Sequence, residues 1–323
     1  MLLVVKGNTM LMTSAVLVVL QLAALLDASA IRSAQSVSAG AMTFDPMTST
    51  PGHVFSTRGR ADSDRKEPDY IAIASTPDGN HLLLVDDANR KVKVMAVTSS
   101  GVARVTSDVR LSKELWDIAL LPDGMVAVTC SQEQFIYLLR LQGDVIEYTS
   151  RFRTEKKYHG VAAGLDNDTL LVTSRDYLDV ITRDGRVVES FFVSQFRRPD
   201  YMCLSGGNDV IVSDWATQEL YRINASTGQV TETMSHPDME TPHQAVVDKG
   251  GNLYVASRGS KRLMVLSPAG EWRTLLQGKR KMPTGVSVTT DDVIVSWADV
   301  QITEDMDMKS WSIVRGYSMS DFN

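Results

Sequence analysis

A unit of about 43 residues recurs along the chain from residue 68 onward. Each copy opens with a short apolar segment, and successive openings are separated by 47, 43, 41, 43 and 41 residues. The openings fall at Pro68, Leu115, Tyr158, Pro199, Pro242 and Pro283. This period and the short β-branched runs inside each copy are typical of β-propeller blades, which contain four strands each.

Turns rich in Gly and Asp separate the strand-like runs within each copy. The second runs are apolar, as expected for strands covered on both faces: HLLLVD, MVAVTC, TLLVTS, DVIVSD, NLYVAS and DVIVSW. The sixth copy lacks a fourth run, and we expect His53 to Arg60 to supply it, which would hide two open sheet edges. The predicted fold is therefore all-β, a six-bladed β-propeller of four-stranded antiparallel blades closed by an N-terminal strand.

The N-terminal segment differs in character from the repeats. An apolar run from Leu11 to Leu26 precedes Ala28-Ser29-Ala30, which has the small-x-small form of a signal-peptidase site. We predict a signal peptide over residues 1–30, a linker over 31–51 and the propeller over 52–323. A membrane anchor stays open as an alternative, although the apolar run is short for a span. The mature domain is not expected to insert into a membrane.

Secretion is the predicted localisation, and two glycosylation sequons, at Asn167 and Asn224, suit it. A cytoplasmic protein, translated from Met42 or lacking the leader, is the alternative. Only two cysteines are present, Cys130 and Cys203, so neither a disulfide framework nor a zinc module such as a RING can be built. The net charge of −6 does not indicate a nucleic-acid binder by itself.

One stretch of the first copy resembles the NHL repeat. In Val85 to Val94 an apolar strand ends at Asp86, and Asn89 followed by basic residues precedes the next strand. The segment before Pro68 is similar to the fourth-strand region of the same family, and the resemblance covers roughly residues 52 to 323. In later copies the position of Asp86 holds other residues: Cys130, Ser174, Asp214, Ser257 and Trp297. The resemblance implies a propeller that binds RNA or protein, as in tripartite-motif NHL proteins.

Basic residues gather in the loops expected on one face of the disc, whereas the turns of the other face are rich in Asp. A positive sector with neighbouring aromatic rings attracts acidic protein surfaces or phosphate backbones. Phe196 is a further ring beside this sector. The predicted binding face consists of Trp116, Arg151, Arg153, Lys156, Lys157, Tyr158, Arg197, Arg198, Trp215, Lys279, Arg280 and Lys281.

The residue after each opening position is expected to point toward the mouth of the channel. Alternate copies place Asp69, His159 and His243 there, a set able to hold a divalent ion with one open position. The segment from Pro242 to Ala256 is similar to a blade of the peptidyl-α-hydroxyglycine α-amidating lyase. That resemblance implies zinc held by histidines from different blades, although Asp69 stands here in place of a third histidine.

No nucleophile elbow, HExxH pair, P-loop or dinucleotide fingerprint occurs in the chain. The sequence therefore favours a recognition platform that binds a protein or peptide partner through the basic face, without a cofactor. The alternatives are a metal-dependent propeller lyase or hydrolase using zinc or calcium, and a single-stranded RNA binder.

Overall fold

The computed structural model describes residues 43–44, 53–55, 68–97, 103–112, 114–289, 292–302 and 308–319. These residues all belong to one compact unit, Ala41–Asn323. The predicted signal peptide and most of the predicted linker lie outside the described residues. No helix within the described ranges is long and apolar enough to cross a membrane.

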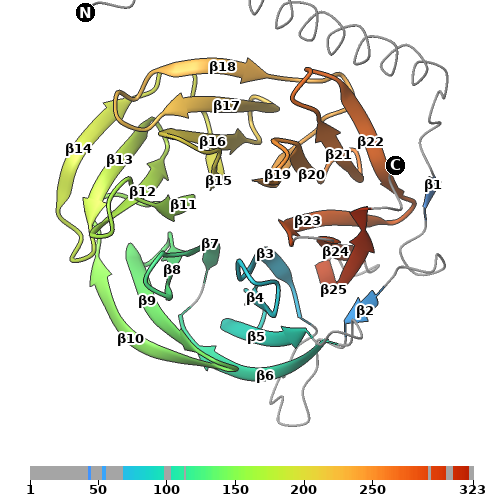
Figure 1. Ribbon diagram of the computed structural model, residues 1–323, viewed down its shortest axis with the longest axis horizontal. Helices are drawn as coiled ribbons and strands as arrows, with labels where there is room; N and C mark the ends of the chain where they lie inside the picture. The colour runs from blue at the N-terminus through green and yellow to red at the C-terminus, as the bar shows by residue number, and fades with distance from the viewer. Residues whose placement is uncertain are drawn as a thin grey trace, which may run out of the picture. The chain divides into compact units, whose positions relative to one another are not determined.

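Six sheets surround a central axis, and each is built from strands that follow one another in the chain (Figure 1). Blade 1 contains β3 (Tyr70–Ser75), β4 (His81–Asp86), β5 (Lys91–Val97) and β6 (Ala103–Arg110). Blade 2 contains β7 (Leu115–Leu120), β8 (Met125–Cys130), β9 (Phe135–Gln142) and β10 (Val145–Arg153). Blade 3 contains β11 (Val161–Ala163), β12 (Thr169–Ser174), β13 (Tyr177–Thr182) and β14 (Val187–Phe192).

The remaining three blades follow the same order from the axis outward. Blade 4 contains β15 (Pro199–Leu204), β16 (Asp209–Asp214), β17 (Glu219–Asn224) and β18 (Val230–Met234). Blade 5 contains β19 (Pro242–Val247), β20 (Leu253–Ser257), β21 (Arg262–Leu266) and β22 (Trp272–Gly278). Blade 6 contains β23 (Lys281–Val288), β24 (Asp292–Ile302) and β25 (Met308–Ser318).

The predicted all-β, six-bladed propeller is confirmed. Each innermost strand contacts the innermost strands of the two neighbouring blades, and β23 of the last blade meets β3 of the first. Pairing within the six blades is antiparallel, and blade 5 gains a fifth strand, β1 (Thr43–Phe44), which pairs in parallel with β22. That strand falls inside the predicted linker and was not expected.

The predicted closing segment, His53 to Arg60, lies mostly outside the described residues. Its first three residues form β2 (His53–Phe55), which is antiparallel to β25 at the outer edge of blade 6. Closure of the ring by the whole segment stays a prediction.

Burial falls from the second strand of a blade to the outermost strand. Every residue of β8 and of β12 is buried, because both faces of these strands pack against other blades. Most of β10 is exposed, since an outermost strand has solvent on one side. The apolar second runs of the sequence are therefore buried along most of their length, as their composition predicts, and the first and third strands supply much of the remaining core.

Two buried polar side chains link the innermost strands of different blades. Asp117 of blade 2 accepts backbone N–H bonds from Val161 of blade 3 at 3.1 Å and from Met202 of blade 4 at 3.2 Å. On the other side Gln244 of blade 5 accepts from Val286 of blade 6 at 3.1 Å and from Ile73 of blade 1 at 2.9 Å. Each half of the ring is thus tied together by one buried side chain.

The six blades form two similar groups of three, in addition to the repeat of single blades. The third position of the opening segments reads Tyr, Asp, Gly and then Tyr, Gln, Gly: Tyr70, Asp117, Gly160, Tyr201, Gln244 and Gly285. Glycine is required at the last position of each triplet because neighbouring atoms approach closely. A Cβ at Gly160 would lie 2.7 Å from Thr173 Oγ1, and one at Gly285 would lie 2.8 Å from Ser296 Oγ.

Candidate functional site

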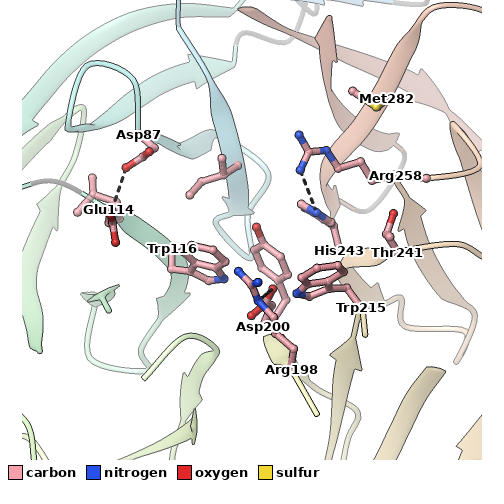
Figure 2. A pocket seen from close by; sticks show the side chains of 14 residues that line it. Asp87, Glu114, Trp116, Arg198, Asp200, Trp215, Thr241, His243, Arg258 and Met282 are labelled. Carbon is pink, nitrogen blue, oxygen red and sulfur yellow. Dashed lines mark hydrogen bonds and ion pairs between the residues drawn. The ribbon is translucent and has the colours of Figure 1, made fainter. Parts of the chain in front are cut away.

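A hollow of about 460 Å³ opens at the mouth of the channel (Figure 2). Its lining comes from two positions of the blade, the start of the innermost strand and the residue that follows the second strand. The first position supplies Trp116, Asp200 and His243, and the second supplies Asp87, Trp215 and Arg258. The size falls within the range of roughly 300–1,000 Å³ found for small-ligand pockets.

Arg198 lies at the mouth with its guanidinium group between two indole rings (Figure 2). Its guanidinium carbon is 4.5 Å from the centre of the Trp215 ring and 5.9 Å from that of Trp116. Stacking on indole faces is favourable for a guanidinium and fixes its plane. Among the described residues, Arg198 forms an ion pair with Asp200, in which Nε lies 3.5 Å from Oδ2. The terminal NH₂ groups of Arg198 therefore remain available for a ligand.

The backbone before β15 is held by a carboxylate at the end of the neighbouring strand. Asp214 accepts hydrogen bonds from the backbone N–H groups of Arg197 at 2.6 Å and Arg198 at 2.9 Å. In blade 1 Asp86 does the same for Asp69, with a distance of 3.1 Å. The strand-terminal Asp of the NHL-like pattern thus positions the loop that leads to the innermost strand.

His243 is paired with Arg258 across one wall of the hollow (Figure 2). Arg258 NH1 lies 3.5 Å from His243 Nε2, and burial together with the charges of Arg258 and Arg198 lowers the pKa of His243 to about 3. A guanidinium can only donate, so Nε2 of the neutral ring accepts and the proton sits on Nδ1. Nδ1 is buried and has no hydrogen-bond partner among the described residues.

His159 takes up a similar position beside Trp116 in the neighbouring blade. The two ring centres are 4.9 Å apart in an edge arrangement. Burial and the charges of Arg198 and Lys157 lower the pKa of His159 to about 4. Trp116 Nε1 is buried and has no hydrogen-bond partner among the described residues, like His243 Nδ1.

Three acidic side chains line the same hollow. Burial raises the pKa of Asp200 to about 7, and its Oδ1 has no hydrogen-bond partner among the described residues although the side chain is almost fully buried. Burial also raises the pKa of Asp87 to about 6, while a hydrogen bond from the Leu115 N–H at 3.0 Å opposes the shift. Glu114 occupies the left-handed backbone region with φ of 57°.

The predicted metal set of Asp69, His159 and His243 is not assembled. Among the described residues no three histidine, cysteine or acidic side chains come close enough to hold a metal ion. The physical reason is that each histidine faces other groups, Trp116 in one case and Arg258 with Tyr201 in the other. Both rings also lie in the positive field of Arg198, which disfavours a cation.

Some members of the predicted binding face are buried, so the expectation that they are exposed is wrong for them. Tyr158 is 2% exposed and donates its hydroxyl hydrogen bond to Asp179 at 2.6 Å. Phe196 and Lys281 are buried as well. Lys156 is engaged by Asp179 at 2.7 Å.

The other predicted basic residues divide between two places. Arg151 and Arg153 belong to the outermost strand β10, where Arg151 stacks on Phe135 at 4.3 Å, so they lie away from the mouth. Lys157, Arg197, Lys279 and Arg280 are exposed, but Arg197 NH1 donates to its own loop. Of the predicted face, the structure brings Trp116, Arg198 and Trp215 together with His243 of the predicted metal set.

Sequence reasoning missed Asp87, Glu114 and Tyr201 as parts of this pocket, and it left Asp200 and Arg258 out of the predicted site. A positional signal was present for two of them, because Asp87 and Arg258 directly follow the second strand of a blade, as the predicted residue Trp215 does. Glu114 offers no such signal, since its orientation depends on an unusual backbone angle.

No protein-family model matches the chain, and no curated protein matches it in sequence. Solved structures share the fold. A streptogramin B lyase structure superposes with a TM-score of 0.56 at 14% identity over 77% of this chain and 84% of that one. Hydrazine synthase of Kuenenia stuttgartiensis gives 0.54 at 14% identity over 74% and 79%. The WD40 propeller domain of Doa1 gives 0.56 at 10% identity over 79% and 94%.

Proposed function

We propose that the protein is a recognition module that binds a segment of a protein or peptide partner at the mouth of its channel. The observation that carries this proposal is the hollow in which Arg198, stacked between Trp116 and Trp215, presents its terminal NH₂ groups. Interface residues that dominate binding are mostly Trp, Tyr and Arg placed in such pockets. A rigid ring of blades holds these groups without requiring a conformational change.

Two other functions receive less support from the same residues. A metal-dependent enzyme lacks an assembled ligand set among the described side chains. Single-stranded RNA binding depends on exposed rings that stack on bases, and Tyr158 and Phe196 are buried. A streptogramin B lyase shares the fold, but at 14% identity its activity does not transfer to this chain.

The binding proposal predicts that Arg198→Met weakens peptide binding at least tenfold. The change keeps much of the side-chain volume and removes the charged donors, which at such a position are worth about 1.5–3 kcal/mol. The full chain is used to select a phage-displayed library of random linear heptapeptides, and the affinities of selected peptides are measured by fluorescence polarisation.

Arg273→Met is the matched control, because Arg273 lies on β22, the fourth strand of blade 5 counted from the axis, and is 61% exposed. It should leave affinity unchanged, and both variants should unfold at the wild-type temperature. Failure to select any peptide, or equal affinities for the wild type and Arg198→Met, contradicts the proposed function.

We also propose that the chain is an NHL-type propeller and that it is secreted. The first assignment is supported by the role of Asp86 and Asp214 in holding the loops before the innermost strands. The second is supported by the sequence of the leader and by the exposed sequon residue Asn167. Sequencing the N-terminus of the mature protein tests secretion: a chain that starts after Ala30 supports it, and one that starts at Met1 contradicts it.

A further inference from the structure

We infer that the mouth pocket selects a dipolar segment, which places a cationic group beside Asp87 and Glu114 and a carboxylate or another acceptor oxygen beside His243 and Arg258. This inference rests on the proposed function and specifies the chemistry of the partner. It follows from the distribution of charge between opposite walls of the hollow, which sequence reasoning did not anticipate.

The acidic wall is built where blades 1 and 2 meet. Asp87 follows β4, and its Oδ1 accepts the Leu115 N–H at 3.0 Å, so the carboxylate is fixed against the start of β7. Glu114 directly precedes that strand. Neither carboxylate forms an ion pair within the described structure, so both remain free to receive a cation.

The backbone of Glu114 supports a functional reason for this wall. A φ of 57° is a conformation that non-glycine residues adopt only at a conformational cost. The residue at the equivalent place before blade 5 is Thr241, which is also left-handed, with φ of 44°. Both residues line the hollow, and strained backbone of this kind concentrates at binding sites.

The basic wall belongs to blade 5. Arg258 follows β20 and forms no ion pair among the described residues, and the Nδ1–H of His243 is a buried donor without a partner there. Arg258 lines the hollow and its guanidinium can only donate, so an acceptor oxygen suits this wall and a cation does not.

The two walls face each other because blades 2 and 5 are opposite members of a ring of six (Figure 1). In Figure 2 Asp87 and Glu114 lie on one side of the hollow, whereas His243, Arg258 and Thr241 lie on the other. Trp116 and Trp215 between them offer apolar surface to the part of the ligand that joins its charges. A peptide that carries a basic group and an acidic group joined by an apolar part fits this arrangement of an acidic wall, two indole rings and a basic wall.

The test compares the peptides that the wild type and two sets of variants select from the heptapeptide library. We expect wild-type peptides to combine Lys or Arg with Asp or Glu at least fivefold more often than unselected phage. Asp87→Asn with Glu114→Gln should remove the enrichment of basic residues and keep that of acidic residues. Arg258→Met should remove the enrichment of acidic residues and keep that of basic residues. Asn at position 87 retains an oxygen for the Leu115 N–H, so the fold should persist.

Glu271→Gln and Arg273→Met are the controls, since this exposed pair lies on the far side of blade 5 from the channel. They should leave both enrichments intact. The inference is overturned if the selected peptides depend on Arg198 but show no paired charges. It is also overturned if both enrichments survive in both sets of variants. The proposed function stands in either case. Peptides whose binding does not depend on Arg198 contradict the proposed function instead.

Discussion

Lys93→Met is expected to lower the free energy of unfolding by about 3–5 kcal/mol. Lys93 Nζ lies 3.0 Å from Asp86 Oδ2, and both side chains are fully buried. Methionine fills the same space but leaves the Asp86 carboxylate in the core without its cation. Because Asp86 also holds the Asp69 backbone and Asn89, the damage should reach the loop at the channel mouth. Urea denaturation followed by tryptophan fluorescence measures the loss.

Lys91→Met provides the matched control. Lys91 is two residues away on the same strand, and its partner Asp108, at 3.3 Å, is 29% exposed. Water can hydrate Asp108 after the substitution, so this variant should lose only about 1 kcal/mol. Equal losses in the two variants would show that the Asp86–Lys93 pair is not the special contact described above.

Acid should relieve the defect of Lys93→Met. Burial raises the pKa of Asp86, and the charge of Lys93 opposes that rise. Without the lysine the folded-state pKa increases further, and stability then falls as pH rises above the unfolded value near 4. The difference in stability between wild type and variant should therefore be smaller at pH 5 than at pH 8.

Asp117→Ala is expected to cost about 3–6 kcal/mol, because the carboxylate accepts three backbone N–H bonds in a fully buried position. Each stranded donor costs about 1–3 kcal/mol. Asp117→Asn keeps one acceptor oxygen for Val161 and Met202 and should cost less than half as much. Comparable losses for Ala and Asn, or losses under 1 kcal/mol for both, would contradict the role of Asp117 as a tie between blades.

The same residue predicts a direction for pH dependence. Burial, opposed by the N–H bonds, raises the pKa of Asp117 to about 7, so the folded protein holds a proton between about pH 4 and pH 7 that the unfolded chain has released. This residue therefore lowers stability as pH rises through that window. The free energy of unfolding of the wild type and of Asp117→Asn should be measured at several pH values. Between about pH 4 and pH 7, that of the wild type should fall relative to that of Asp117→Asn as pH rises.

The fold could be predicted from the sequence because each blade repeats a local pattern that its own residues largely determine. The second strands show this well, since TLLVTS and DVIVSD each have a central run of three apolar residues that is completely buried. The three-blade repeat was visible in the opening segments, yet its meaning required the contacts of Asp117 and Gln244 with other blades.

The site was less predictable, because it depends on which side chains from distant blades meet. Trp116, Arg198 and Trp215 were expected on one face, but nothing local indicates that Arg198 stacks between the two indoles. Tyr158 looked like a surface ring beside basic residues and is instead buried over Asp179. The predicted metal set is not assembled, and His243 lies in the positive field of Arg258 and Arg198. The spacing of residues along the chain does not reveal such contacts between distant blades.

The indole N–H signals in a ¹H–¹⁵N spectrum of the full chain test the central claim most directly. The five tryptophans give one indole signal each, and Trp116→Phe and Trp215→Phe assign the two at the mouth. On titration with a selected peptide, we expect these two signals to move together, because both indoles line the hollow. Movement of other indole signals while these two stay in place would contradict binding at the channel mouth.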